Sequence, residues 1–150
     1  MRKRLSEATK DAMRAKDKAR LSTLRLMNAA IKDRDIAARS EANPDGVSDT
    51  EILSIMAKMI KQRQDSAKAY EEAGRIELGE GERSEIKVIE EFLPKQLSAE
   101  ETEAAIKAAI AESGAESIRD MGKVMGVLKS KYTGQMDFGK TGAAIKAILV

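Results

Sequence analysis

Glycines and basic residues share the polar face of a helix that the spacing predicts over residues 117–132. This face holds no carboxylate and consists of Arg119, Gly122, Lys123, Gly126, Lys129 and Ser130. Each glycine inside a helix costs about 1 kcal/mol relative to alanine, so the pair indicates that something approaches the helix backbone closely. A phosphate backbone fits, because the flanking cations neutralise it. The alternative, which spacing alone favours slightly, is that another helix of the same domain packs across the glycines.

The opposite face of the same predicted helix is apolar and is expected to face a core. Its residues recur at helical spacing and are Ile118, Met121, Val124, Met125, Leu128 and Tyr132. Ser117 and Asp120 have the spacing of a capping box and predict the helix start. The glycine face is therefore expected to be the exposed side of an amphipathic helix.

The residue types that the chain lacks limit its chemistry. There is no His and no Cys, which removes Cys/His zinc sites, thiol nucleophiles and histidine-dependent triads. No group of acidic residues has the spacing of a calcium loop. Adjacent acids such as Glu71 and Glu72 are typical of a solvated helix surface. We therefore predict no catalytic residue, no cofactor and no metal.

Residues 134–141 match the nucleotide-binding pattern Gly-x-x-x-x-Gly-Lys-Ser/Thr letter for letter. That pattern binds phosphate only between a buried strand and a helix, in a sheet that also supplies a metal-binding acid. Here it follows a predicted helix. We interpret Gly134 and Gly139 as turn residues around an Asp137 helix cap.

Helical periodicity and capping signals organise the first half of the chain. Apolar residues at helical spacing predict one long amphipathic helix from about residue 5 to Arg39. Breakers over 43–46 predict a turn, and Ser48 with Glu51 predicts a capped second long helix reaching about Gly74. Met56 and Met59 are expected to fill the core. The short loop predicts that these two long helices form an antiparallel hairpin.

The second half begins with a segment that glycine should weaken. Gly79 and Gly81 predict a frayed or broken helix start, with the pattern resuming at Arg83 and ending before Pro94. A capping box at Ser98 then starts an alanine-rich helix. Gly114 is expected to end that helix, and a last helix begins at about Asp137 or Phe138.

No segment shows sustained alternation with period two, so the predicted fold is all-α. It consists of an N-terminal body built on a long helical hairpin, residues 1–94, joined to a small C-terminal three-helix domain, residues 95–150. The longest apolar runs are interrupted by charges, and the N-terminal Met-Arg-Lys-Arg is followed by Leu-Ser-Glu. We therefore expect a cytoplasmic protein with no signal peptide and no membrane span.

Charge is distributed unevenly along the chain, although the formal net charge is only +2. Residues 1–41 carry 12 Lys/Arg against 6 Asp/Glu, residues 42–94 carry 7 against 12, and residues 95–150 carry 8 against 7. The basic first segment permits a polyanionic partner. A basic surface that partly neutralises a neighbouring acidic helix explains the pattern equally well.

The order and spacing of several short motifs resemble the YqeY family over nearly the whole chain. They are LRLMNAAIK at 24–32, KQRQDS at 61–66, AGR at 73–75, EEFLPKQLS at 90–98 and DMGKVMG at 120–126. In that family the C-terminal part is similar to the tail domain of the GatB subunit of tRNA-dependent amidotransferases. The resemblance implies an all-α protein with a portable tail that contacts tRNA and helps to present it to catalytic subunits.

The function that the resemblance implies is a non-catalytic accessory protein that touches tRNA or a tRNA-dependent enzyme. The candidate contacts are Lys95, Arg119, Gly122, Lys123, Gly126, Lys129 and Lys131. A carbon–nitrogen ligase activity with glutamine as nitrogen donor would be inherited in name only, because no glutaminase nucleophile or ATP site is visible. The rival hypothesis is a protein-docking module that binds a partner through the N-terminal hairpin without nucleic acid. The residues leave the oligomeric state open.

Overall fold

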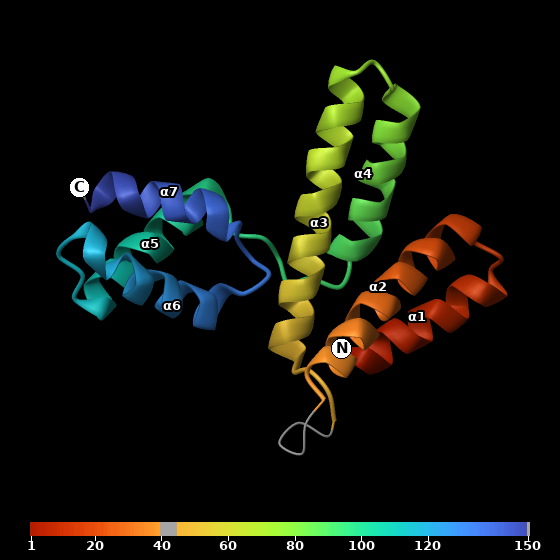
Figure 1. Cartoon of the computed structure of the whole chain (residues 1–150), viewed down its shortest axis with the longest axis horizontal. Coiled ribbons are helices and arrows are strands. Elements are labelled where there is room, and N and C mark those ends of the chain that lie inside the picture. The colour runs from red at the N-terminus through yellow and green to blue at the C-terminus, as the bar shows by residue number, and fades with distance from the viewer. Residues whose placement is uncertain (40–44, 150) are drawn as a thin grey trace. The chain divides into compact units, whose positions relative to one another are not determined.

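The computed structural model describes residues 1–39 and 45–149, and over these residues the chain is all-α, as predicted. Helices follow one another without a strand (Figure 1), in the order α1 (Arg2–Arg14), α2 (Lys18–Ala37), α3 (Asp49–Glu72), α4 (Ile76–Glu90), α5 (Ala99–Ser113), the short 3₁₀ helix η1 (Ile118–Asp120), α6 (Met121–Tyr132) and α7 (Phe138–Ile148). Residues 40–44, which include most of the predicted turn, lie outside the described residues.

The helices divide between two compact units, Met1–Leu93 and Pro94–Val150. Each unit has its own cluster of buried apolar side chains. That the two units are separate domains, the second of them a tail domain, stays a prediction.

The single long helix predicted to reach Arg39 is wrong, because the chain breaks between α1 and α2. Lys16 adopts a left-handed conformation with φ of 56°. Its N–H and that of Asp17 still donate to Met13 and Ala12. The Asp17 side chain accepts from the Arg20 N–H and so caps α2. The break was missed because neither glycine nor proline marks it.

The hairpin predicted between the first two long segments is also wrong. Helix α3 packs chiefly against α4, and α1 packs against α2 (Figure 1). The predicted capping box at Ser48 and Glu51 is confirmed at the start of α3. The first unit is therefore built from two helix pairs, with a core lined from all four helices.

Helix α4 runs without interruption through both glycines, which corrects the predicted frayed start. Gly79 is buried, and a Cβ added there would lie 3.1 Å from Glu71 Cγ and 3.3 Å from the Ala67 carbonyl oxygen. The glycine thus lets α4 approach α3 closely, and packing offsets its poor helix propensity. No atom of the described residues lies within 4 Å of the Cβ position at Gly81.

The core of the first unit consists mainly of aliphatic and methionine side chains. The largest fully buried ones are Leu5, Leu24, Met27, Ile52, Met56 and Ile89. Met59 is 8% exposed, so the prediction that Met56 and Met59 fill the core is confirmed. Burial of such side chains is the main favourable term holding the four helices together.

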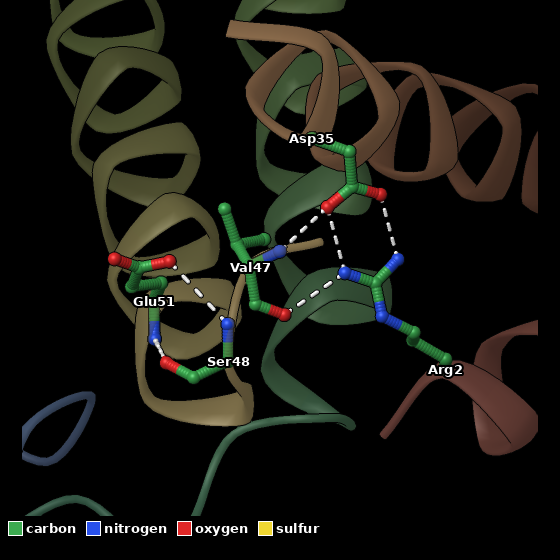
Figure 2. A network of polar contacts seen from close by, with 5 residues as sticks. All are labelled: Arg2, Asp35, Val47, Ser48 and Glu51. Carbon is green, nitrogen blue, oxygen red and sulfur yellow. Dashed lines mark hydrogen bonds and ion pairs between the residues drawn. The ribbon is translucent and has the colours of Figure 1, made fainter. Parts of the chain in front are cut away.

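A polar network closes the end of this unit where α1 begins and α2 ends. Arg2 donates to both carboxylate oxygens of Asp35, and Asp35 also accepts the Val47 N–H (Figure 2). Arg2 also donates to the Val47 carbonyl oxygen, 2.9 Å away. The next residue, Ser48, opens the capping box of α3, so the network fixes how the chain enters that helix.

The second unit packs α5, α6 and α7 around Ile106, Val124, Leu128 and Ile145. The predicted capping box at Ser98 and the left-handed Gly114 at the end of α5 are confirmed. The capping box of Ser117 and Asp120 starts η1, and α6 begins only at Met121. Ile118 is 48% exposed, so its predicted place on the core face is wrong.

The extended segment before α5 pairs with the loop after α6 in the same unit. The Leu97 N–H donates to the Gln135 carbonyl oxygen at 2.9 Å, and the Gln135 side chain donates to the Lys95 carbonyl oxygen at 3.3 Å. The Gln96 amide donates to the Gly134 carbonyl oxygen. These bonds hold the start of the unit against the C-terminal end of α6.

Candidate nucleic-acid interface

The two glycines of α6 lie on an open face. Gly122 and Gly126 are exposed, and no described atom lies within 4 Å of the Cβ position at either residue. The alternative of a helix packed across these glycines therefore finds no support within the described part of the second unit. Their small size leaves α6 with a stretch of accessible backbone.

Basic side chains border this open face, but a carboxylate does too. Arg119 and Lys123 are exposed, and Lys123 Nζ lies 3.8 Å from Asp120 Oδ1. The expectation of a face without carboxylate is thus wrong at its N-terminal end. Asp120 accepts the N–H groups of Glu116 and Ser117, which lowers its pKa and keeps it ionised. Because the Lys123 side chain is 72% exposed, this ion pair is weak and can exchange.

Lys129 lies over an aromatic ring. Its Nζ lies 6.0 Å from the centroid of the Phe138 ring in a cation–π arrangement. Phe138 opens α7 and packs, partly buried, against the core of the second unit. Lys129 lies seven residues after Gly122, about two turns along the same face. Sequence reasoning missed the role of Phe138, because the contact joins two helices.

Lys131 does not join the glycine face. Its Nζ lies 2.5 Å from Glu112 Oε2, and this hydrogen bond raises the lysine pKa. Nine residues separate Lys131 from Gly122, which places it about half a turn away on the helix. Lys131 therefore links α6 to α5, and its charge is already partly compensated by Glu112.

Lys95 is exposed and lies in the segment that pairs with Gln135, beyond the end of α6. Lys123 and Lys129 thus share the exposed side of α6 with the two glycines, whereas Arg119 precedes α6 in η1. The structure places Lys95 near the C-terminal end of α6, where a long flexible side chain can extend the surface.

The stretch that matches the nucleotide-binding pattern is occupied by its own contacts. Asp137 caps α7 by accepting the N–H groups of Gly139 and Lys140 at 2.9 and 3.3 Å. Thr141 is 3% exposed and donates to the Asp137 carbonyl oxygen at 2.8 Å. Gly139 was expected in a loop turn but lies within the first helical turn of α7. Gly134 adopts the left-handed backbone conformation of a turn glycine, with φ of 81°. The backbone N–H groups and the threonine hydroxyl that would bind a phosphate in a nucleotide-binding loop therefore form the hydrogen bonds that cap α7.

Over residues 1–39 and 45–149, no group of three acidic side chains could hold a metal ion. Fold and surface define an all-α protein with two small helical cores, whose second unit presents a basic, glycine-bearing helix. The sequence model of the family described as Yqey-like protein matches residues 2–149, and the chain belongs to this family.

Several curated fungal proteins are similar to this chain. One, from Lachancea thermotolerans, is named altered inheritance of mitochondria protein 41, mitochondrial; it is 32% identical over 99 residues, which cover 66% of this chain and 51% of the relative. A protein of the same name from Pyrenophora tritici-repentis is 31% identical over 134 residues, 88% of this chain and 71% of the relative. The Kluyveromyces lactis relative is 33% identical over 88 residues, 59% of this chain and 45% of its own length. This chain thus spans about half the length of two of these relatives.

These relatives contradict the expected cytoplasmic location. The names of those proteins place them in mitochondria, which overturns the expectation. The physical reason for the error is that charges within apolar runs report on membrane spans and not on the compartment. Among the described residues, no helix is both long enough and apolar enough to cross a membrane.

Proposed function

We propose that the protein is a non-catalytic accessory factor that binds tRNA through η1 and α6 of its second unit. The proposed contact surface, called here the glycine face, consists of Arg119, Gly122, Lys123, Gly126 and Lys129. Phosphate oxygens approach the backbone at the glycines, and the three cations neutralise them. The tRNA stays a substrate of another enzyme, whose active site this chain does not supply.

The observation that carries the proposal is the empty space above Gly122 and Gly126. Two glycines in a twelve-residue helix lower its stability, and no contact of the described chain needs their small size. A ligand that must approach the helix backbone closely would require glycine at these two positions. The resemblance of this part of the chain to the tail domain of a tRNA-dependent amidotransferase subunit supports tRNA as that ligand.

The decisive experiment is a titration of tRNA with the full chain at two or more salt concentrations. Replacing Lys123 and Lys129 by Glu should weaken binding and lower the slope of log K against log salt. The slope should fall by about 1.5, because each lost phosphate contact removes about 0.7 to 0.9.

The matched control reverses two exposed lysines of the same unit, Lys107→Glu on α5 and Lys146→Glu on α7. It changes the net charge equally and leaves the glycine face intact. Binding by the Lys123→Glu, Lys129→Glu variant that equals the parent, or an equal loss in the control, would show that the glycine face is not the contact.

The rival function is protein docking through the first unit. Two exposed aliphatic side chains favour it, Ile76 at 53% and Leu78 at 47% exposure, which lie beside the turn between α3 and α4. Exposed apolar groups at a helix-pair tip suit a protein partner. Two results would favour this function over tRNA binding. The full chain would bind no tRNA at low salt, and the double substitution Ile76→Ser with Leu78→Ser would abolish capture of one defined protein.

A further inference from the structure

Three cations form a straight line along the outer face of α2 in the first unit. Lys18, Arg25 and Lys32 are spaced seven residues apart and are all exposed. Seven residues advance a helix by about 10.5 Å and return to nearly the same side, so the line is about 21 Å long. The buried side chains of α2, among them Leu24 and Met27, lie on the other side of the helix. We call these three residues the α2 line.

The α2 line carries charges that are not paired within the described chain. Ion pairs of the first unit engage five arginines, namely Arg2, Arg14, Arg20, Arg63 and Arg83. None of the ion pairs found among the described residues includes Lys18, Arg25 or Lys32. Asp35 is engaged by Arg2, which leaves Asp33 within α2 and the N-cap Asp17 beside Lys18 as the nearby carboxylates. The ion pair that joins α2 to the end of α4 uses Arg20, so it leaves the three cations of the line unpaired among the described residues.

Folding stability does not account for the line. Lys18 is the first residue of α2, where the helix dipole disfavours a cation, and no acidic residue lies in that first turn. The short side chains of Ser22 and Ala29 lie between the cations and are exposed, so they leave the charged groups accessible. A positive line with no ion-pair partner among the described residues suits an external polyanion.

We infer that the α2 line binds the phosphodiester backbone of a nucleic acid. A linear polyanion matches cations that repeat along a straight helix, because it carries a negative charge at every phosphate along its length. An anionic membrane fits less well, because the exposed aliphatic residues of α2, Leu26 and Ile36, lie ten residues apart and form no apolar stripe. This site lies on the first unit and goes beyond the proposed function, since it does not depend on the glycine face.

The test uses the full chain with Lys18, Arg25 and Lys32 replaced by Gln and a labelled RNA duplex as probe. Fluorescence anisotropy across a salt series should show at least tenfold weaker binding at low salt. The slope of log K against log salt should fall by about 2 to 3, because three phosphate contacts are lost. Arg25→Lys keeps the charge and should bind as the parent does.

The matched control replaces three exposed lysines of α3 and α4, Lys61, Lys68 and Lys87, by Gln. It removes the same charge from the same unit and should retain most of the binding. An equal loss in both triple variants would show that only net charge matters and would overturn the inference. Circular dichroism of each variant excludes a loss caused by unfolding, since Gln is a good helix former.

Two further measurements separate this site from other outcomes. The triple Gln variant should lose affinity by the same factor when Lys123→Glu and Lys129→Glu are already present. If the triple Gln substitution causes no further loss of RNA affinity in that background, the α2 line is not a binding site, and the proposal for the glycine face is unaffected. Vesicles containing phosphatidylserine serve as the second probe, and a loss of vesicle binding with unchanged RNA binding would assign the α2 line to membranes.

Discussion

Arg2 and Asp35 are joined by two parallel hydrogen bonds of 2.7 Å, although 33 residues separate them in the chain. The same guanidinium reaches the Val47 carbonyl oxygen, and the same carboxylate accepts the Val47 N–H (Figure 2). Such paired, charge-assisted bonds are among the stronger polar contacts in proteins. Three segments of the first unit are therefore held together by one ion pair.

The first prediction concerns the acid stability of this ion pair. The hydrogen bond from Arg2, then that from Val47, lowers the pKa of Asp35 from 3.8 to about 2. Because the folded-state pKa lies below the unfolded value, the stabilisation is present above pH about 4 and is lost as the pH falls towards 2. Asp35→Asn should lower the midpoint of urea unfolding at pH 7. Between pH 4 and 2, the midpoint should fall less steeply in this variant than in the parent. Urea titrations monitored by circular dichroism measure both effects.

Asp33→Asn is the control for this prediction, because Asp33 lies on the same helix and forms no ion pair among the described residues. It should keep the pH dependence of the parent. If Asp35→Asn and the parent lose stability in parallel between pH 4 and 2, the ion pair does not contribute to acid unfolding.

The second prediction concerns the break between α1 and α2. Lys16 has φ of 56°, a conformation that costs a residue with a Cβ about 1 kcal/mol or more and costs glycine little. Lys16→Gly should raise the free energy of unfolding by about 0.5 kcal/mol, since the added freedom of the unfolded chain offsets part of the gain. Ala15→Gly is the control, because Ala15 has φ of −74° and should lose stability. Denaturant titrations measure the free energy of unfolding of both variants. A lower stability for Lys16→Gly than for Ala15→Gly would contradict the proposed backbone strain at Lys16.

The third prediction separates the two glycines of α4. At Gly81 the Cβ position is open, so Gly81→Ala should raise the free energy of unfolding by about 0.5 to 1 kcal/mol through helix propensity alone. At Gly79 a Cβ would press on Glu71 and on the Ala67 carbonyl, so Gly79→Ala should gain nothing or destabilise. The free energies of unfolding are measured by thermal or urea unfolding. An equal increase for both variants would show that α3 can shift to make room for a Cβ at Gly79.

These comparisons show which features local sequence could predict. The capping boxes at Ser48 and Ser98 were predicted correctly, because each depends on residues three positions apart. The all-α class followed from helical periodicity in the same way. Gly79 was misjudged, because its reason is a contact with α3, and helix propensity contains no information about a neighbouring helix.

The candidate site shows the same limit. The helical spacing that aligns Lys123 and Lys129 with the glycines was available from the sequence. The pairing of Lys131 with Glu112 and the contact of Lys129 with Phe138 depend on how α6 packs between two other helices. The spacing of the first helix likewise could not show the turn at Lys16, since the cost of a left-handed lysine is offset by the Asp17 cap that follows it.

The fourth prediction sets stability against function on the glycine face. Because no described atom occupies the Cβ positions of Gly122 and Gly126, replacing both by Ala should stabilise α6 by about 1 to 2 kcal/mol. If RNA phosphates approach the backbone there, the same variant should bind tRNA several-fold more weakly, although no charge has changed. Thermal unfolding and tRNA titration of one preparation measure both effects. Gly81→Ala is the control, which should gain stability without losing affinity, and a double alanine variant that is more stable and binds tRNA as the parent does would mean that the glycines serve neither packing nor RNA contact.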